Sequence, residues 1–129
     1  MLIRPVTMND HDAMMMLAEK AGYGMTSLPQ DAGVLEAKIK YSESSFAGDP
    51  MREDEQRFLL VMEDEETGEI VGSTGIKAHV GMSSPFYSYK LSMIVQASTK
   101  PEVYARNHVL HMVNDYTGVS EIGSLFLRK

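Results

Sequence analysis

Cysteine is absent from the sequence, and this absence excludes a disulfide scaffold, a thiolate nucleophile and a zinc site built on cysteine. No run of about 18 apolar residues occurs, so neither a membrane-spanning helix nor a membrane partner is expected. The N-terminus shows no basic region followed by an apolar stretch and a cleavage site, because the strand-like segment 2–6 begins at once. We therefore expect no signal peptide and a cytoplasmic location.

Basic residues are in the minority, since 12 Lys and Arg stand against 18 Asp and Glu, for a net charge of −6. Binding to nucleic acid requires clustered Lys and Arg, which the sequence does not show, so no nucleic-acid partner is expected. A negative field is better suited to a cationic small-molecule substrate. The P-loop and dinucleotide-binding glycine patterns are also absent, and no serine lies in the glycine-flanked turn of a nucleophile elbow.

The remaining composition is that of one globular domain, with 129 residues and an apolar fraction of 43%, and we treat residues 1–129 as a single domain. Helical spacing of apolar residues predicts a first helix over roughly 9–21, with an N-cap at Asn9 and a stop at Gly22. A second helix is predicted from about Asp31 to a stop at Gly48.

The segment between these helices carries two glycines and the hydroxyl groups of Thr26 and Ser27. Glycine permits close backbone approach, and hydroxyl groups at a turn can contact a ligand. Two interpretations remain open at this point: an ordinary connection between helices, or a part of a ligand pocket.

The second half of the chain has the patterns of β-strands. A continuous apolar run predicts a strand covered on both faces, and a glycine-containing turn and a returning strand follow it. Strict period-two alternation then predicts a long third strand, and two further apolar runs flank a turn at 114–118. The five predicted strands after the helices are 58–62, 70–80, a strand opening at Pro85, 109–113 and 122–127. The predicted fold class is α+β, with a strand, two helices and then an antiparallel meander.

Histidine offers the most evident acid, base or metal-binding groups, and the sequence contains His11, His79, His108 and His111. His108 and His111 would point to opposite faces of a strand, and no carboxylate completes a set of metal ligands with them. We expect no metal site, and surface or pocket-lining positions for these histidines.

The predicted elements run in the order strand, two helices and a meander leading to a buried strand, and seven short motifs are spread along them. The motifs are "IRPV" at 3–6, "GMTSLP" at 24–29, "EDEETG" at 63–68, "AHVG" at 78–81, "PFYSYK" at 85–90, "NDYTGVSE" at 114–121 and "SLFL" at 124–127. The order of the elements resembles the opening half of the acyl-CoA N-acyltransferase (GNAT) fold. The motifs, in the same order and at similar spacing, resemble those of arginine N-succinyltransferase over essentially the whole chain.

This resemblance implies transfer of a succinyl group from succinyl-CoA to the α-amine of L-arginine, in arginine catabolism. Succinyl-CoA is then a co-substrate, and no permanently bound cofactor is implied. The strand "SLFL" is expected to pair with the pantetheine arm of CoA as an added strand would. The resemblance places the succinyl-CoA contact at Leu125, and we extend it along the strand to Phe126 and Leu127. For the arginine substrate we expect contacts from Thr26, Ser27, Asp115 and Glu121.

The sequence departs from the family pattern after Leu127, where only Arg128 and Lys129 follow. The family continues with an Asp-Pro turn and a glycine-rich stretch whose amides cradle the CoA pyrophosphate. We therefore expect a partial domain, truncated before the pyrophosphate loop. The family's histidine proton donor also lies beyond Lys129, so no catalytic residue is assigned in this chain, which by itself is expected to be inactive.

Two other functions remain open. The chain could be a non-catalytic half-domain or interaction subunit, or a GNAT acyltransferase for another amine; the family is in any case sometimes described as having α and β subunits. An exposed apolar strand edge at 124–127 would need a cover, so we expect a homo-oligomer or pairing with a second subunit.

Overall fold

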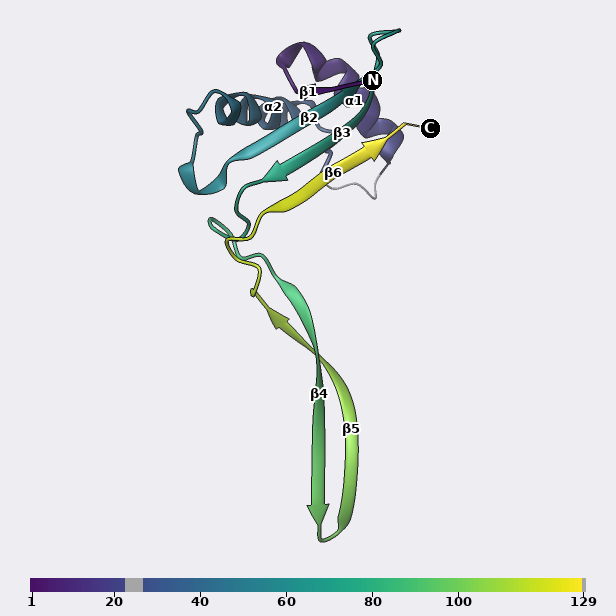
Figure 1. The fold of residues 1–129 in the computed structure, drawn as a ribbon, viewed down its shortest axis with the longest axis vertical. Coiled ribbons are helices and arrows are strands. Elements are labelled where there is room, and N and C mark those ends of the chain that lie inside the picture. The colour runs from purple at the N-terminus through teal and green to yellow at the C-terminus, as the bar shows by residue number, and fades with distance from the viewer. Residues whose placement is uncertain (23–26, 129) are drawn as a thin grey trace.

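A computed structural model describes residues 1–22 and 27–128. Within these ranges, four antiparallel strands form one sheet in the order β1-β2-β3-β6, and β4 and β5 form a separate ribbon that extends away from it (Figure 1). The predicted α+β class, with a strand, two helices and antiparallel strands, is confirmed. The strands are β1 (Leu2–Pro5), β2 (Arg57–Glu63), β3 (Ile70–Lys77), β4 (Ser88–Thr99), β5 (Glu102–Val113) and β6 (Glu121–Leu127).

The first helix, α1 (His11–Ala21), follows a single 3₁₀ turn, η1 (Met8–Asp10), so the predicted N-cap at Asn9 is wrong. The Asp10 carboxylate accepts hydrogen bonds from the Thr7 amide at 2.8 Å and the Thr7 hydroxyl at 3.0 Å. It also forms a two-bonded ion pair with the Arg4 guanidinium, at 2.7 and 2.8 Å. The side chain that organises this turn is therefore one residue further along, because it also meets a cation from β1.

The second helix, α2 (Ala32–Phe46), begins as predicted: the carboxylate of Asp31 accepts a hydrogen bond from the Val34 amide at 2.9 Å. Strand β1 ends opposite Leu60 of β2, so the next backbone groups along this edge of β2 need other partners. Serines of α2 provide two of them: Ser42 Oγ accepts from the Leu59 amide at 2.8 Å, and Ser45 Oγ accepts from the Arg57 amide at 3.2 Å. These bonds fix the helix beside the start of β2.

The hydrophobic core lies between the two helices and one face of the sheet. Leu59 and Val61, which alternate along β2, point into it, whereas Phe58 and Leu60 on the opposite face are only half-buried. The prediction that β2 is covered on both faces is therefore not met by the described residues. The buried members of the core are Val6, Met14, Leu17, Ala18, Leu28, Leu35, Ile39, Leu59, Val61 and Ile70. Neither described helix is long and apolar enough to cross a membrane.

The β4–β5 ribbon accounts for a difference between the predicted and observed strand pairing. The runs 109–113 and 122–127 were expected as neighbours across the turn at 114–118, but β5 pairs with β4, and β6 returns to pair with β3 (Figure 1). The neck of the ribbon is closed by backbone bonds from Val80 N to Val119 O at 3.0 Å and from Gly118 N to Val80 O at 2.7 Å. The meander is thus interrupted by an inserted hairpin.

We predict that the Asp10–Arg4 pair makes the free energy of unfolding decrease when the pH falls into the acidic range. The Arg4 guanidinium holds the pKa of the Asp10 carboxyl below its usual value of 3.8. Because the folded-state pKa is lowered, the contribution of this carboxylate is present above that value and is lost as the pH falls through the folded-state pKa. Asp10→Asn, which keeps an acceptor oxygen, should lower the free energy of unfolding by about 2 kcal/mol at pH 7.

Urea denaturation at pH 7 and at pH 3 measures this effect. The difference between wild type and Asp10→Asn should shrink at pH 3, and an equal difference at both pH values would contradict the prediction. Glu19→Gln is the matched control, because Glu19 is exposed on α1 and forms no ion pair with another described residue.

Candidate functional site

Strand β6 lies at the edge of the sheet and contains a bulge. In the register with β3, Ser124 and Leu125 together lie opposite the single residue Thr74. Ser124 has a φ of 52°, in the left-handed region that side chains other than glycine seldom adopt. Within the described residues β6 pairs only with β3, so its other edge has no strand partner. A bulge beside an open edge is a common way to direct a backbone toward a ligand.

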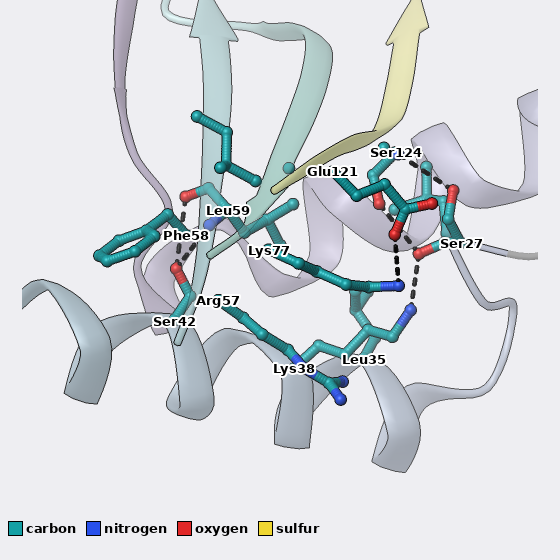
Figure 2. Close-up of a pocket in the computed structure, with 14 residues that line it drawn as sticks. Ser27, Leu35, Lys38, Ser42, Arg57, Phe58, Leu59, Lys77, Glu121 and Ser124 are labelled. Carbon is teal, nitrogen blue, oxygen red and sulfur yellow. Dashed lines mark hydrogen bonds and ion pairs between the residues drawn. The ribbon is translucent and has the colours of Figure 1, made fainter. Parts of the chain in front are cut away.

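Ser27, which lies in the segment before α2, is hydrogen-bonded directly to this bulge. Its hydroxyl accepts a hydrogen bond from the Ser124 amide at 3.1 Å, and its carbonyl accepts one from the Ser124 hydroxyl at 3.1 Å. The Lys38 ammonium, from α2, donates to the same carbonyl at 2.6 Å (Figure 2). On β3, Ser73 Oγ donates to the Ser124 carbonyl at 2.9 Å. The backbone amide and the backbone carbonyl of Ser124 are therefore both hydrogen-bonded, by Ser27 and Ser73 respectively.

The three residues predicted to contact succinyl-CoA alternate across β6. Leu125 is 71% exposed and Leu127 is 60% exposed, whereas Phe126 packs against the hydrophobic core. The outward face of the strand thus presents two apolar side chains next to an unpaired edge. That combination suits an extended, largely apolar ligand arm lying along the strand.

An open cleft of about 340 Å³ lies beside the bulge, between α2 and the adjoining ends of β2, β3 and β6. Its floor is mostly apolar, and three basic side chains, Lys38, Arg57 and Lys77, extend into it from α2, β2 and β3 (Figure 2). The full lining is Ser27, Leu28, Leu35, Lys38, Ser42, Arg57, Phe58, Leu59, Gly75, Ile76, Lys77, Glu121, Gly123 and Ser124.

The three basic groups differ in how they are paired. Lys77 forms an ion pair with Glu121 at 2.8 Å, and Arg57 has Glu55 at 3.4 Å. Lys38 is half-buried and has no carboxylate within ion-pair distance among the described residues. Burial lowers the pKa of the Lys38 ammonium, and the positive charges of Arg57 and Lys77 lower that pKa further.

The structure brings together only some of the residues predicted to contact arginine. Ser27 and Glu121 both line the cleft. Asp115 lies exposed in the turn between β5 and β6 and does not line the cleft. Thr26 falls outside the described residues. In this state Glu121 is already paired with Lys77, so a guanidinium ligand would have to compete with that lysine.

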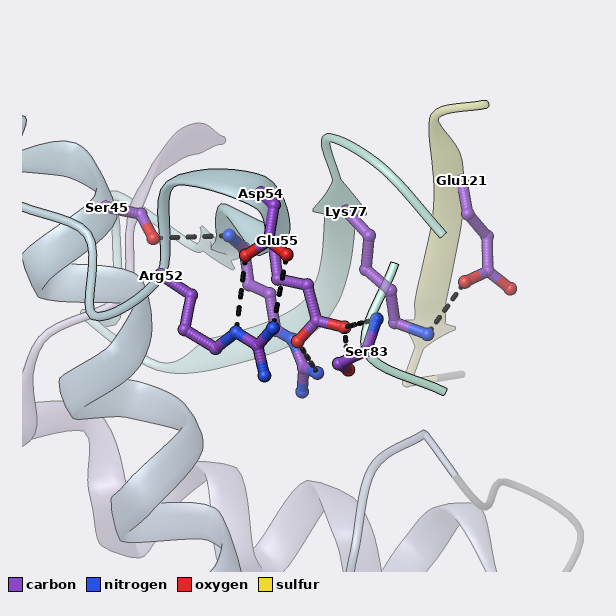
Figure 3. A network of polar contacts seen from close by, with 8 residues as sticks. Ser45, Arg52, Asp54, Glu55, Lys77, Ser83 and Glu121 are labelled. Atoms are coloured by element: carbon purple, nitrogen blue, oxygen red, sulfur yellow. Dashed lines mark hydrogen bonds and ion pairs between the residues drawn. The ribbon is translucent and has the colours of Figure 1, made fainter. Parts of the chain in front are cut away.

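A second polar network supports the cleft from the loop that follows β3 (Figure 3). The Glu55 carboxylate accepts hydrogen bonds from the Ser83 amide at 3.2 Å and from the Ser83 hydroxyl. The bond from Ser83 is the main reason that the pKa of the Glu55 carboxyl lies below its usual range. Glu55 also pairs with Arg57, so this network joins the start of β2 to the neck of the ribbon.

The histidines do not gather at the cleft. His11 hydrogen-bonds the Ala32 carbonyl, His79 hydrogen-bonds the Gly118 carbonyl, and His108 and His111 are exposed on the ribbon. Among the residues that the structure describes, no group of three His, Asp or Glu side chains could hold a metal ion.

The three basic residues of the cleft were not identified from the sequence. Successive members of this set, Lys38 on α2, Arg57 on β2 and Lys77 on β3, are at least 19 positions apart in the sequence. Each belongs to an element whose sequence pattern indicates only ordinary core or surface structure. The one local signal is that Lys38 adjoins Ile39 and follows Leu35, two buried residues of α2. A lysine beside the apolar stripe of a helix also occurs at many surfaces, so only the fold distinguishes it.

We predict that the close approach of β3 and β6 requires glycine at position 72. A Cβ atom at Gly72 would lie 2.8 Å from the Phe126 carbonyl oxygen and 3.2 Å from Leu127 Cδ1. The oxygen is part of the backbone and cannot move without displacing β6, so Gly72→Ala should lower the free energy of unfolding by about 1 to 3 kcal/mol.

Thermal and urea unfolding measure this effect, with Gly75→Ala as the control on the same strand pair. A Cβ atom at Gly75 would have its nearest neighbour at 3.5 Å, which is an ordinary contact. Equal stability of the two variants would contradict the prediction.

Comparisons with known proteins identify the family to which the chain belongs. The model of the family described as arginine N-succinyltransferase beta subunit matches residues 1–129. Proteins named arginine N-succinyltransferase from Escherichia coli strains SE11 and 55989 are each 40% identical over 127 residues, covering 98% of this chain. The chain spans only 37% of the length of these relatives.

A solved structure shares the fold. It is that of arginine/ornithine succinyltransferase subunit AI from Pseudomonas aeruginosa, with a TM-score of 0.88 and 37% sequence identity. The match covers 98% of this chain and 38% of that chain. Because the family model matches all 129 residues and relatives named arginine N-succinyltransferase are 40% identical over 98% of the chain, this chain belongs to the arginine N-succinyltransferase beta subunit family.

Proposed function

We propose that this chain is the N-terminal part of an acyltransferase that moves a succinyl group from succinyl-CoA to the α-amine of L-arginine. The observation that carries the proposal is the family match over all 129 residues. The geometry of β6 supports it, because an open strand edge with the exposed side chains of Leu125 and Leu127 fits the pantetheine arm of CoA. Succinyl-CoA is a co-substrate in this reaction, and the chemistry requires no permanently bound cofactor.

In this proposal, β6 holds the acyl donor through Leu125, Phe126 and Leu127. We assign the oxyanion contact to the Leu125 amide, because the Ser124 amide already donates to Ser27 Oγ. A donor to the thioester carbonyl as it becomes an oxyanion is the electrostatic contribution that acyl transfer depends on most. The fixed position of the bulge, supported by Ser27 and Ser73, favours such a role because a preorganised donor does not have to reorient during the reaction.

The proposed arginine contacts are Ser27, Glu121, Thr26 and Asp115. Glu121 is the strongest of them, since its carboxylate lies in the cleft beside the bulge and could exchange Lys77 for a guanidinium. Asp115 is the weakest, because it is exposed in a turn outside the cleft. No residue of this chain is proposed as the proton donor, and we place the reaction in the cytoplasm.

We predict that the 129-residue chain alone releases no CoA thiol from succinyl-CoA when L-arginine is added. Acyl transfer requires both substrates to be bound close together in a reactive orientation. Such positioning lowers the activation free energy by about 7 to 11 kcal/mol in well-oriented reactions. A chimaera that joins this chain to the remaining length of an Escherichia coli relative should restore thiol release. A thiol-reactive dye follows the reaction, and other primary amines serve as control substrates.

The outcomes separate the three candidate functions. Steady turnover by the chain alone would overturn its expected inactivity. A folded chimaera that transfers succinyl to another amine but not to arginine would favour a different GNAT acyltransferase. A folded chimaera without any turnover would leave this chain as a non-catalytic interaction module and would overturn the proposal.

The chain is also proposed to assemble with a second copy through the β4–β5 ribbon. Leu91 of β4 lies opposite Leu110 of β5, and both are more than 60% exposed on the apolar face of the ribbon. An isolated two-stranded ribbon is marginally stable in water. Burial of this face against a second ribbon would stabilise both, and the open edge of β6 offers a further pairing surface.

Sedimentation velocity tests the assembly. The wild-type chain should form dimers at micromolar concentration, and Leu91→Glu should weaken them at least about tenfold, because it places a charge in the buried face. Ser92→Glu is the matched control, since Ser92 lies on the opposite face of the ribbon. Monomers at every concentration would contradict this assembly.

A further inference from the structure

Positive charge is concentrated in the cleft although the chain as a whole carries a net charge of −6. The charged residues that line the cleft are Lys38, Arg57, Lys77 and Glu121, so the lining carries three positive charges and one negative charge. These basic groups come from three different elements, and Figure 2 shows them extending into the same open space. The fold therefore assembles a local field opposite in sign to that of the molecule.

Among the three basic groups of this cleft, Lys38 differs in having no carboxylate partner within the described residues. An ammonium group has three N–H donors, and the structure gives Lys38 one acceptor, the Ser27 carbonyl at 2.6 Å. The lysine is half-buried and has no ion-pair partner in the described ranges. A partly desolvated ammonium with donors available is stabilised by an anionic acceptor placed beside it.

The walls of the cleft indicate which kind of anion fits. Leu28, Leu35 and Ile76 contribute apolar side chains to a space of about 340 Å³. No glycine-rich turn that would cradle a phosphate lines it; the described lining instead offers apolar side chains and separate basic groups. A short aliphatic chain that ends in a carboxylate matches both features.

We propose that this cleft binds the carboxylate of a substrate, with Lys38 as its principal partner and Arg57 and Lys77 as flanking positive charges. This inference rests on the proposed function, in which two groups have the required chemistry: the free carboxylate of the succinyl moiety and the α-carboxylate of arginine. Either one would lie beside Gly123 and Ser124, and so next to the strand that is proposed to hold the thioester.

Glu121 acts in the free protein as a resident competitor for this site. Its carboxylate pairs with Lys77 at 2.8 Å and so occupies one of the flanking positive charges. Removal of the Glu121 charge should therefore strengthen the binding of a free dicarboxylate, whereas removal of the Lys38 charge should weaken it. These opposite effects distinguish a carboxylate site from a general structural role of either residue.

Titration of the ¹⁵N-labelled 129-residue chain with succinate, L-arginine and agmatine, which is arginine without its carboxylate, tests the proposal. Binding is followed through the amide signals of Ser27, Gly123 and Ser124. Lys38→Met should weaken carboxylate binding about tenfold, the usual scale for loss of one charge-assisted contact. Lys90→Met, which removes the same charge from the exposed ribbon, should leave binding unchanged. Glu121→Gln should tighten the binding of succinate severalfold.

The ligands distinguish the two sources of the carboxylate. Binding of succinate but not of L-arginine would assign the cleft to the succinyl group. Binding of L-arginine but not of agmatine would assign it to the amino acid. The proposal is overturned when neither carboxylate shifts these amides, or when a folded Lys38→Met binds as wild type does. Should Lys38→Met fail to fold, an unchanged succinate affinity in Glu121→Gln would overturn it instead.

The proposed function and this inference can fail separately. Carboxylate binding that depends on Lys38, together with an inactive chimaera, would overturn the proposed succinyltransferase function but would support the carboxylate site. Full succinyl transfer to arginine by a chimaera carrying Lys38→Met, with unchanged Michaelis constants for both substrates, would overturn the carboxylate site but would support the proposed function.

Discussion

The pairing of β6 with β3 is the interaction on which the rest of the structure depends. The chain leaves the sheet after β3, passes through the whole β4–β5 ribbon and returns to the same edge, so this pairing joins segments about 50 residues apart. The open edge, the bulge and the cleft all exist only because β6 returns there. The glycine at position 72 allows the two backbones to approach closely enough for this to happen.

Serine hydroxyls form hydrogen bonds to backbone groups that join neighbouring elements of this protein. Ser42 and Ser45 attach α2 to the backbone of β2 where β1 no longer reaches it. Ser27 and Ser73 hold the bulge of β6 from two sides. A short side chain with one donor and two acceptors can satisfy a backbone group without filling much of the core. The interior is therefore held by polar contacts at the points where regular strand pairing stops.

Most of the elements could be predicted from the sequence because local patterns determine them. Helix α2 begins beside Asp31 as predicted, the period-two alternation predicted after Pro85 corresponds to one face of the ribbon, and the β2–β3 hairpin has its turn at 64–69. The N-cap of α1 was misplaced by one residue because the Asp10 carboxylate gains an ion pair with Arg4, and a contact with another strand leaves no trace in the local spacing. The family resemblance likewise depended on short motifs that are legible in the sequence.

The sequence by itself determined the approximate positions of the helices and strands, the absence of thiol chemistry, and the resemblance to succinyltransferases. Only the tertiary structure decided that β5 and β6 belong to different sheets, since both runs are apolar and pairing choice depends on long-range register. It alone also brought Lys38, Arg57 and Lys77 into one cleft. Electrostatic interaction depends on distance in space, and positions far apart along a chain become neighbours only when helix and sheet pack together.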